Sequence, residues 1–425
     1  MTQSLIAFDT DRIKDYVFAT GRLTEIRGAS ALLEELNLLK TEETIHDVCP
    51  SATVVYCNGG SALAVAPTTD VKIKHIITAV EALYRRETVT ATISGADILY
   101  DPNRPFGEQV REAAIELRQV KDEKPREARV PVTPWLRICD ACGQHPASCA
   151  DGDQFICKAC RIKRQKGKPQ RNVFWQGVGR TDRPGFLGAA RQAGDHRWRD
   201  EQLPVDLDDI GAVSSPPGYV GFLYADVNSM GKKLETLKTR DEYAEFADKA
   251  DKLIRDVVHQ ALRRQAQPRS VRRREIAPFE ILLMGGDDLM LVTAGDLAVS
   301  VALDIVDSYE RHAPHDLTLS LGLVLAHARF PIYAMHDLAA ALLKSAKKVG
   351  GSALDFAVIT AVGSRDLEWL RDEALTDRSF ALKPPKDWRY RLTQRPYSLA
   401  DFAKLCYHAR QLQAVRFPRS QLQAM

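Results

Sequence analysis

The sequence predicts an α+β protein with two copies of a βαββαβ unit, a zinc ribbon inserted between them and a short helical segment after the second copy. Two observations carry this prediction. One is an internal repeat of strand, hairpin and helix patterns, and the other is a pair of Cys-x-x-Cys motifs between the repeats. A chain of 425 residues is long enough for two or three domains with their own hydrophobic cores.

Each copy contains a Gly-Gly dipeptide between two apolar runs, VVYCNGGSALAV at 54–65 and ILLMGGDDLMLV at 281–292. Placing the first Gly-Gly on the second gives an offset of 285 − 59 = 226 positions, and we expect this register to hold without a gap. Three residue pairs share it: Gly59 and Gly285, Pro105 and Pro331, Lys121 and Lys347.

The order of patterns in both copies is strand, helix, hairpin, helix, strand and helix. Asp9, near the end of the first strand, aligns with Asp226 at an offset of 217. We therefore predict two ferredoxin-like units, each with helices covering one face of a mainly antiparallel sheet.

We predict five segments along the chain. They are the first unit at 1–130, a zinc-ribbon module at 131–175, a linker or loop region at 176–218, the second unit at 219–362, and a helical C-terminal segment at 363–425. Two basic runs, KRQKGKPQR and RRQAQPRSVRRRE, are expected to be solvated loops, with RNA or nucleotide contact as the alternative.

Four cysteines form two knuckles separated by fourteen residues: Cys139, Cys142, Cys157 and Cys160. Each knuckle can turn two thiolates toward one tetrahedral ion, so we predict a structural Zn²⁺ with no open coordination position. His145 and Cys149 lie between the knuckles and could replace a ligand, although neither has knuckle spacing.

The second unit carries an acidic constellation that the first lacks. Asp226 ends the apolar strand GFLYAD, and Asp287 with Asp288 follows two glycines in the hairpin. Neighbouring strands would bring these three carboxylates together, and clustered carboxylates favour a pair of Mg²⁺ or Mn²⁺ ions, as in nucleotidyl transfer. Gly285 and Gly286 would let a triphosphate approach the backbone closely.

At an offset of 226, Ser61 and Ala62 replace the two aspartates in the first unit, while Asp9 remains. We expect that site to be catalytically silent. Its hairpin residues Gly59, Gly60 and Ser61 are predicted to hold an acceptor nucleotide opposite the metal site. The alternative is that the first unit only buries an exposed face of the second.

Composition excludes little. The chain has 59 basic and 56 acidic residues and a net charge of +3, so any affinity for nucleic acid must come from local patches. No apolar run approaches the roughly 18 residues that a membrane span needs, and we expect a cytoplasmic protein.

Several motifs together carry a family resemblance. ADVNSMG, MGGDD and AKKVG lie in the second unit, FDTDRIKDYVF and LTEIRGASALLEEL lie in the first, and the four-cysteine module lies between them. This order resembles the large polymerase/cyclase subunit of type III CRISPR effector complexes, in a form that lacks the HD nuclease domain. In that family the two units are palm domains similar to GGDEF nucleotide cyclases, and we call them the first palm and the second palm.

The resemblance implies a nucleotidyltransferase that joins ATP into a cyclic oligoadenylate messenger of antiviral defence and releases pyrophosphate. It implies that Asp226, Asp287 and Asp288 are the catalytic metal ligands. Its motifs add Asn228, Ser229 and Lys347 as nucleotide-binding candidates. It also implies guide RNA, target RNA and other CRISPR effector subunits as partners.

Two alternatives stay open at this level. The chain could be a scaffold subunit that binds guide RNA and partner proteins with little cyclase activity, or its product could be a cyclic dinucleotide or a linear oligonucleotide. The segment RPYSLADFAKLCYHARQLQAVRFPRSQLQAM at 395–425 resembles only the beginning of the helical C-terminal domain of the family.

Overall fold

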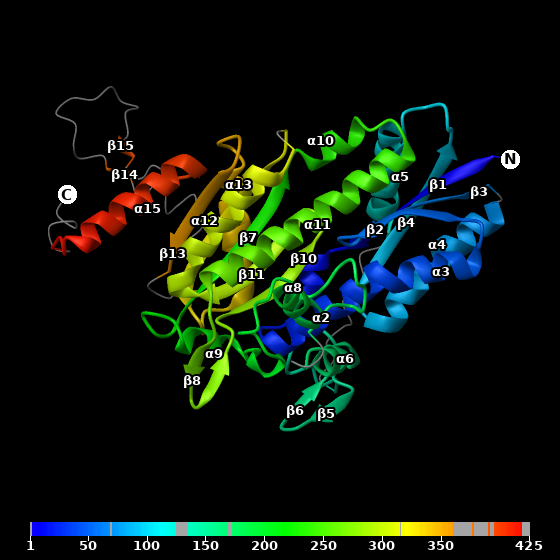
Figure 1. Cartoon of the computed structure of the whole chain (residues 1–425). Helices are drawn as coiled ribbons and strands as arrows, with labels where there is room; N and C mark the ends of the chain where they lie inside the picture. Colours follow the sequence, from blue (N-terminus) through cyan, green and yellow to red (C-terminus); the bar gives the residue numbers. More distant parts are fainter. Residues whose placement is uncertain are drawn as a thin grey trace.

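The computed structural model describes residues 2–68, 70–124, 135–168, 172–314, 316–359, 376–377, 390–391 and 395–418. Two α+β units lie side by side, the first in blue and cyan and the second in green to orange (Figure 1). Within these residues, no helix is long and apolar enough to cross a membrane.

The first palm has the predicted order of elements. They are β1 (Gln3–Asp11), α1 (Ile13–Val17), α2 (Leu23–Glu35), the π-helical η1 (Leu36–Lys40), α3 (Thr41–Val48), β2 (Thr53–Asn58), β3 (Ser61–Pro67), α4 (Asp70–Thr88), β4 (Thr92–Tyr100) and α5 (Phe106–Glu123). The four strands form an antiparallel sheet in the order β2-β3-β1-β4.

The second palm repeats this topology and extends it. Its elements are β7 (Tyr219–Asn228), α10 (Met230–Glu235), α11 (Arg240–Gln265), the hairpin β8 (Arg269–Val271) and β9 (Arg274–Ile276), β10 (Phe279–Gly285), β11 (Asp288–Ala294), α12 (Gly295–His312), β12 (Thr318–His327), α13 (Ile332–Ala346) and β13 (Ala353–Val358). The sheet order is β10-β11-β7-β12-β13-β16, with β13 parallel to β12. The first four strands occupy the same places as β2-β3-β1-β4, which confirms the predicted pair of ferredoxin-like units.

The C-terminal segment adds to the second sheet. The strand β16 (Tyr397–Ser398) pairs with β13, and the helix α15 (Leu399–Ala414) follows it. Two further two-residue strands, β14 (Thr376–Asp377) and β15 (Tyr390–Arg391), pair with each other. Most of the predicted segment between 363 and 394 lies outside the described residues.

The pairing of strands corrects the predicted gapless register. Ser61 lies opposite Asp9 in the first sheet, and Asp288 lies opposite Asp226 in the second, so the hairpins align at 288 − 61 = 227. The prediction of 226 was wrong by one residue at the hairpin, because it matched two Gly-Gly dipeptides whereas hydrogen-bonded pairing sets the register.

Two backbone hydrogen bonds support the corrected register. The amide of Thr10 donates to the carbonyl of Gly60 at 2.7 Å, and the amide of Val227 donates to that of Asp287 at 3.2 Å. The positions of Asp287 and Asp288 are therefore taken in the first palm by Gly60 and Ser61, not by Ser61 and Ala62. The strands after the hairpin, β4 and β12, align at an offset of 226. The alignment of the two palms therefore contains a one-residue gap between the hairpin and these strands.

The sequence predicted helices on one face of each sheet, but the structure has helices on both faces. A β-carbon on Gly221 would lie 2.2 Å from Ala298 Cβ of α12, whereas a β-carbon on Gly322 would lie 2.2 Å from Ala339 O of α13. Because these glycines point to opposite faces, α12 and α13 sandwich the second sheet. In the first palm, α5 and α4 likewise pack on opposite faces. The strands are therefore buried on both faces, which explains near-continuous apolar runs such as VGFLYA.

The region between the palms contains β5 (Cys149–Asp151), β6 (Gln154–Ile156), α6 (Lys158–Lys166), α7 (Val173–Gln176), α8 (Phe186–Gln192), the 3-10 turn η3 (Asp200–Gln202) and α9 (Leu207–Ala212). The sequence predicted a linker or loop over 176–218. Instead, Phe186 and Trp198 of this region are buried and pack, together with Trp175 just before it, against Phe279 of the second palm, with ring centroids 5.0 to 5.9 Å from it. Periodicity could not show this, because the helices are too short to repeat an apolar face.

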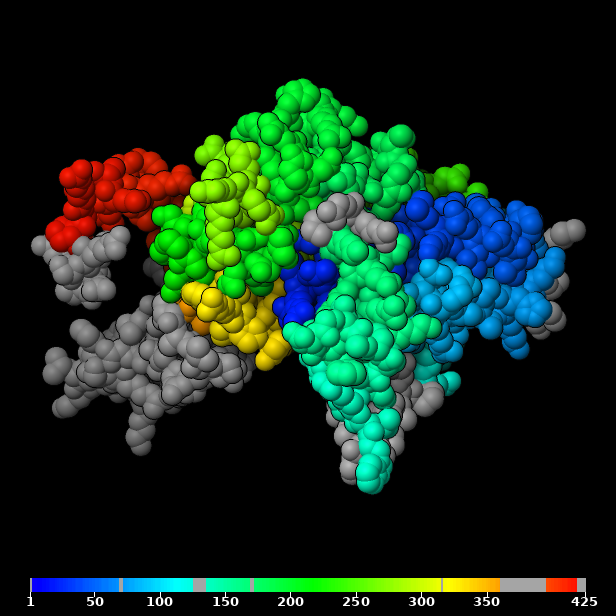
Figure 2. All heavy atoms as spheres, turned by 90° about the horizontal axis from the view of Figure 1, so that it is seen from below, coloured from blue at the N-terminus to red at the C-terminus, as the bar shows by residue number. Residues whose placement is uncertain are grey.

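The zinc-ribbon module stands out from the body of the protein and its last helix packs on the first palm (Figure 2). A β-carbon on Gly28 of α2 would lie 1.8 Å from Lys163 O, and one on Gly167 would lie 1.7 Å from Thr24 O. Small residues at these two positions therefore allow α6 and α2 to approach backbone to backbone.

Candidate active site and zinc site

The three predicted carboxylates meet at one end of the second sheet. Asp226 on β7 lies directly opposite Asp288, the first residue of β11, and Asp287 lies in the two-residue turn before it. Opposite residues of an antiparallel pair have Cα atoms about 4.5 to 5.5 Å apart and present their side chains on the same face. The structure thus brings together the acidic triad that the sequence singled out.

The electrostatics of the triad favour a bound cation. Burial, followed by the charges of Asp226 and Asp288, raises the pKa of Asp287 to about 6. Burial also raises the pKa of Asp288, and the positive charge of Lys14 opposes this rise. The Oδ1 atom of Asp288 is buried and makes no hydrogen bond within the described residues. These oxygen donors fit Mg²⁺ or Mn²⁺, which would supply the missing partner.

Lys347 is the C-cap residue of α13, and its ammonium pairs with the carboxylate of Asp226. The first palm repeats this contact, since Lys121 of α5 pairs with Asp9 at 2.6 Å. Both lysines therefore approach the sheet from the helix that follows the last strand of the repeat.

Asn228 and Ser229 follow Asp226 and occupy the edge of the site. The Asn228 amide donates to the hydroxyls of Thr318 and Ser320, both at 2.9 Å, so its NH₂ group is engaged within the sheet. Ser229 has a left-handed backbone with φ of 64° and begins α10. These contacts fix the backbone that leaves β7, and a role in binding nucleotide remains a prediction.

The turn that carries Asp287 is braced from behind by residues that the sequence analysis missed. The amide of Gly286, with φ of 63°, donates to the buried Asp251 carboxylate at 3.3 Å. Asp251 also pairs with Arg255 at 3.0 Å and Arg183 at 3.2 Å. Asp251 and Arg255 could have been noticed as an i,i+4 charged pair on the apolar face of α11.

The first palm lacks a comparable triad, as predicted, but it retains more acid than Asp9 alone. Asp11 accepts hydrogen bonds from Thr92 and Ser94, at the positions where Asn228 contacts Thr318 and Ser320 in the second palm. Lys121 reaches Asp11 at 3.1 Å as well as Asp9. Lysine side chains thus neutralise this site internally, which agrees with a silent copy.

The two Gly-Gly hairpins touch at their tips. A β-carbon on Gly59 would lie 3.2 Å from Gly286 Cα, and one on Gly285 would lie 3.1 Å from Asn58 Oδ1. The hairpin of the first palm, which lacks the aspartates, therefore contacts the GGDD hairpin of the second palm directly. Gly60 itself is closed off, because a β-carbon there would lie 2.3 Å from Ile13 Cδ1 and its φ is 88°.

A residue of the first palm also enters the second site. The ammonium of Lys14, on α1, contacts the hydroxyl of Tyr224 and lies 4.5 Å from the centre of its ring. Tyr224 stands two residues before Asp226 on β7, and burial, followed by the negative charge of Asp288, raises the pKa of its phenol. Nothing in the sequence signalled Lys14, because it is 212 positions from Asp226 (226 − 14 = 212).

Buried ion pairs lock the palms together. Arg27 of α2 pairs with Glu280 of β10 through two hydrogen bonds of 2.8 and 2.9 Å, and Asn172 donates to the same carboxylate at 2.6 Å. Arg255 of α11 pairs with Glu34 of α2 at 2.7 Å. These pairs hold the first palm in a fixed position against the strand that leads to Asp287.

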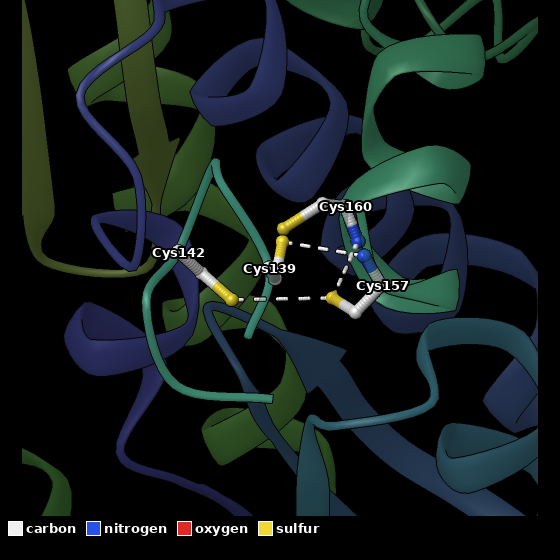
Figure 3. A group of neighbouring side chains, drawn as sticks. All are labelled: Cys139, Cys142, Cys157 and Cys160. Carbon is white, nitrogen blue, oxygen red and sulfur yellow. Dashed lines mark hydrogen bonds between the residues drawn. The ribbon is translucent and has the colours of Figure 1, made fainter. Parts of the chain in front are cut away.

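The four predicted cysteines form one cluster, in which all four sulfur atoms lie within 4.8 Å of one another (Figure 3). The amide of Cys157 donates to Cys139 Sγ at 3.2 Å, and the amide of Cys160 donates to Cys157 Sγ at 3.5 Å. Hydrogen bonds from the other thiols lower the pKa of Cys142. The set fits a single tetrahedral ion held by thiolates.

The alternative ligands do not join this cluster. Cys149 instead directs its sulfur toward the carbonyl of Ile156 at 3.4 Å, and His145 is not among the residues that could share the ion. Four thiolates would fill all four positions of a tetrahedral ion, which is the ligand set of structural rather than catalytic zinc sites.

The comparisons agree with this architecture. Residues 219–353 match the family model of Cas10/Cmr2, second palm domain. Among curated proteins, none matches the chain. The second palm therefore has the sequence features of a Cas10-type palm, and the chain is Cas10-like, as its resemblance to the type III CRISPR subunit predicted.

Solved structures extend the likeness of fold to nearly the whole chain. A chain of the apo Csm1–Csm4 cassette aligns with a TM-score of 0.61 and 17% identity, covering 95% of this chain and 57% of that one. The same cassette in complex with one ATP aligns with a TM-score of 0.59 and 17% identity, covering 86% and 56%. The complex with cA4 gives a TM-score of 0.57 and 17% identity, covering 86% and 55%. The chain thus spans little more than half the length of the structures that it matches.

Proposed function

We propose that this chain is a metal-dependent nucleotidyl cyclase that converts ATP into a cyclic oligoadenylate and releases pyrophosphate. The observation that carries the proposal is the convergence of Asp226, Asp287 and Asp288 on one end of the second sheet, with an unpartnered buried oxygen on Asp288. These carboxylates would hold two Mg²⁺ or Mn²⁺ ions, which supply activation of a ribose hydroxyl and charge stabilisation at the transferred phosphate.

The chain's own residues prepare this chemistry. The pairing of β7 with β11 fixes two carboxylates, and the bond from Gly286 to Asp251 fixes the turn that carries the third. The left-handed conformation of Gly286 permits the tight turn, and a β-carbon there would lie 3.5 Å from the hydroxyl of Tyr56 in the first palm. Lys347 stands beside Asp226, where an ammonium can bind phosphate oxygens once a cation neutralises the carboxylate.

The comparison structures support ATP as the substrate and stepwise growth of the product. Their Csm1–Csm4 cassettes are described in complex with one ATP, with pppApA, with pppApApA and with cA4. A linear intermediate and a cyclic end product are what repeated 3′-hydroxyl attack at one metal site would give.

We further propose that the first hairpin forms part of the acceptor site through Gly59 and Ser61, whereas Gly60, which the sequence placed with them, is buried. The contact of the two hairpin tips supports this role, since it places the first hairpin next to the residues that would bind the donor. Because Gly60 is closed by Ile13, the informative change is Ser61→Phe. Equilibrium binding should give two nucleotides per wild-type chain and about one per Ser61→Phe chain, whereas two in both would exclude the role.

The partners that fit this proposal are guide RNA, target RNA and other subunits of a CRISPR effector, acting in cytoplasmic antiviral defence. The two predicted basic runs are placed differently. KRQKGKPQR, as far as it is described, belongs to α6 and its packing on the first palm. RRQAQPRSVRRRE contains the end of α11 and the β8–β9 hairpin, with Arg272 and Arg273 at the tip.

The test is to incubate the purified chain with each NTP and Mg²⁺ or Mn²⁺ and to resolve the products by mass spectrometry. We expect pyrophosphate and cyclic oligoadenylate from ATP alone. The matched control is Asp287→Asn/Asp288→Asn, which keeps the shape of the hairpin and removes two charges. Cyclic dinucleotide as the sole product would change the product class. If no product forms either with or without target RNA and other subunits, the cyclase proposal fails and the alternative of a scaffold subunit remains.

A further inference from the structure

The first helix of each palm packs beside the other palm. The short helix that follows the first strand of each copy, α1 or α10, leaves its own sheet and packs near the other palm. On one side, α1 brings Lys14 to Tyr224 of the second palm. On the other side, the chain after α10 receives hydrogen bonds from the start of α5, with the amides of Phe106 and Gly107 donating to the carbonyls of Lys238 and Leu237, both at 2.9 Å.

Both helices begin in the same way. Arg12 and Ser229, which are equivalent at the offset of 217, each have a left-handed backbone, with φ of 48° and 64°. A left-handed residue at the start of a helix is unusual for side chains other than Gly, Asn and Asp. Its presence in both copies shows that the crossing is part of the repeat. The equivalent of Lys14 in α10 is Gly231, so the two copies do not share a lysine at this position.

Aromatic contacts seat α1 on the second palm. Phe18, just after the helix, stacks on His336 of α13 with ring centroids 4.8 Å apart. His336 in turn stacks on Tyr224 at 5.8 Å. Phe18 and His336 are both buried, so the backbone that carries Lys14 is anchored rather than free to swing away. The side chain of Lys14 itself is only partly buried.

A charge count shows what this ammonium can do. The triad carries three negative charges. Lys347 pairs with Asp226, and Lys14 contacts the hydroxyl of Tyr224, which lies two residues before Asp226 on the same strand. Two divalent ions and ATP would bring about four positive and about four negative charges, which leaves the triad's excess of about three negative charges unchanged. The ammonium groups of the two lysines would then bind the polyphosphate, because the divalent ions would neutralise the carboxylates.

We propose that Lys14 of the first palm is a substrate-binding residue of the second palm's active site, where its ammonium binds the phosphates of ATP. This inference rests on the proposed function, and it makes the active site composite: the carboxylates come from one palm and one of the phosphate-binding cations comes from the other. It gives the catalytically silent palm a chemical reason to be retained.

The competing explanation is that Lys14 only satisfies the buried hydroxyl of Tyr224. A double-mutant design separates the two. Lys14→Met removes the ammonium, Tyr224→Phe removes the hydroxyl, and Lys14→Met/Tyr224→Phe removes both, so that no buried group is left without its partner. Lys232→Met, on the equivalent helix α10, is the matched control because it deletes an exposed lysine that faces no carboxylate triad.

The measurement is the affinity for α,β-methylene-ATP with Mg²⁺, since nucleotidyl transfer cannot break that bridge, together with the KM for ATP and the thermal unfolding midpoint. We expect Lys14→Met to weaken binding and raise KM on the order of tenfold, as loss of a charge-assisted hydrogen bond does. The double variant should stay equally weak, Lys14→Arg should recover part of the affinity, and Tyr224→Phe should lie closer to wild type than to Lys14→Met.

Binding by Lys14→Met within about twofold of Lys232→Met, or restored binding in the double variant with a restored unfolding midpoint, would overturn the inference. If the wild type binds the analogue but makes no product from ATP, the proposed function fails while the affinities still decide the role of Lys14. If the wild type does not bind the analogue at all, both fail. If Lys14→Met does not fold, Lys14→Arg and the double variant carry the comparison.

Discussion

Removing Arg27 should loosen the contact between the palms more than any single surface change. Its guanidinium is 2% exposed and donates to both oxygens of Glu280, which is fully buried. It also donates to the carbonyl of Pro204 at 2.9 Å and to that of Gly167 at 3.3 Å. In Arg27→Met, the Glu280 carboxylate would stay buried with only Asn172 as a donor.

The expected loss follows from the burial of both partners. Breaking a buried ion pair from one side destabilises a protein by about 3–5 kcal/mol, because the other charge remains without compensation. In Arg27→Met/Glu280→Met no charge is left behind, and the loss should fall to about 1–3 kcal/mol for the unpaired Asn172 amide and the two carbonyls. The double variant should therefore be more stable than Arg27→Met alone.

Urea unfolding followed by far-UV circular dichroism measures both variants. Arg104→Met is the matched control, because Arg104 pairs with Glu112 at 2.5 Å on the surface and its removal should cause no measurable change. The ATP KM of Arg27→Met should also rise if the first palm must be held in place for binding. A loss of less than about 1 kcal/mol in Arg27→Met, or a double variant weaker than the single one, would refute this account of how the palms are joined.

Three further predictions concern the two sites. Asp287→Ala/Asp288→Ala should reduce product formation by at least about 10²-fold while the unfolding midpoint stays the same or rises, because like charges are removed; turnover that survives would place the chemistry elsewhere. The pKa of Asp287 is raised to about 6, above the value near 3.9 in an unfolded chain. The metal-free folded protein therefore holds this proton more tightly, and its free energy of unfolding should fall as the pH rises from about 4 to about 6. Mg²⁺ must displace this proton below pH 6, and calorimetry should show its affinity falling by up to about tenfold per pH unit between pH 6 and 5, whereas a flat profile would contradict the shift. Purified protein should contain about one equivalent of zinc, and Cys157→Ser should lose it and unfold more easily while His145→Ala keeps it; less than about half an equivalent in the wild type would count against the cluster.

The sequence determined the features that depend on residue type and local spacing. Two Cys-x-x-Cys knuckles predict the four-sulfur cluster, because each short spacing brings two thiols to one point. The repeat of strand, hairpin and helix predicted the order of elements along both palms, because apolar periodicity decides which residues can share a core. The acidic triad was likewise visible, since Asp226 and the GGDD hairpin lie at the ends of strands that the repeat makes neighbours.

Tertiary structure decided what depends on pairing and on contacts between distant segments. The hairpin register shifted by one residue, because a match of two glycines does not determine which backbone groups bond, whereas the bonds from Thr10 and Val227 do. The aromatic cluster around Phe279 turned an expected linker into packed structure, since very short helices carry no periodic signal. Lys14 could enter the second site only because α1 crosses to the other palm, and a crossing of that kind is set by how two surfaces fit together, which no local pattern in either segment encodes.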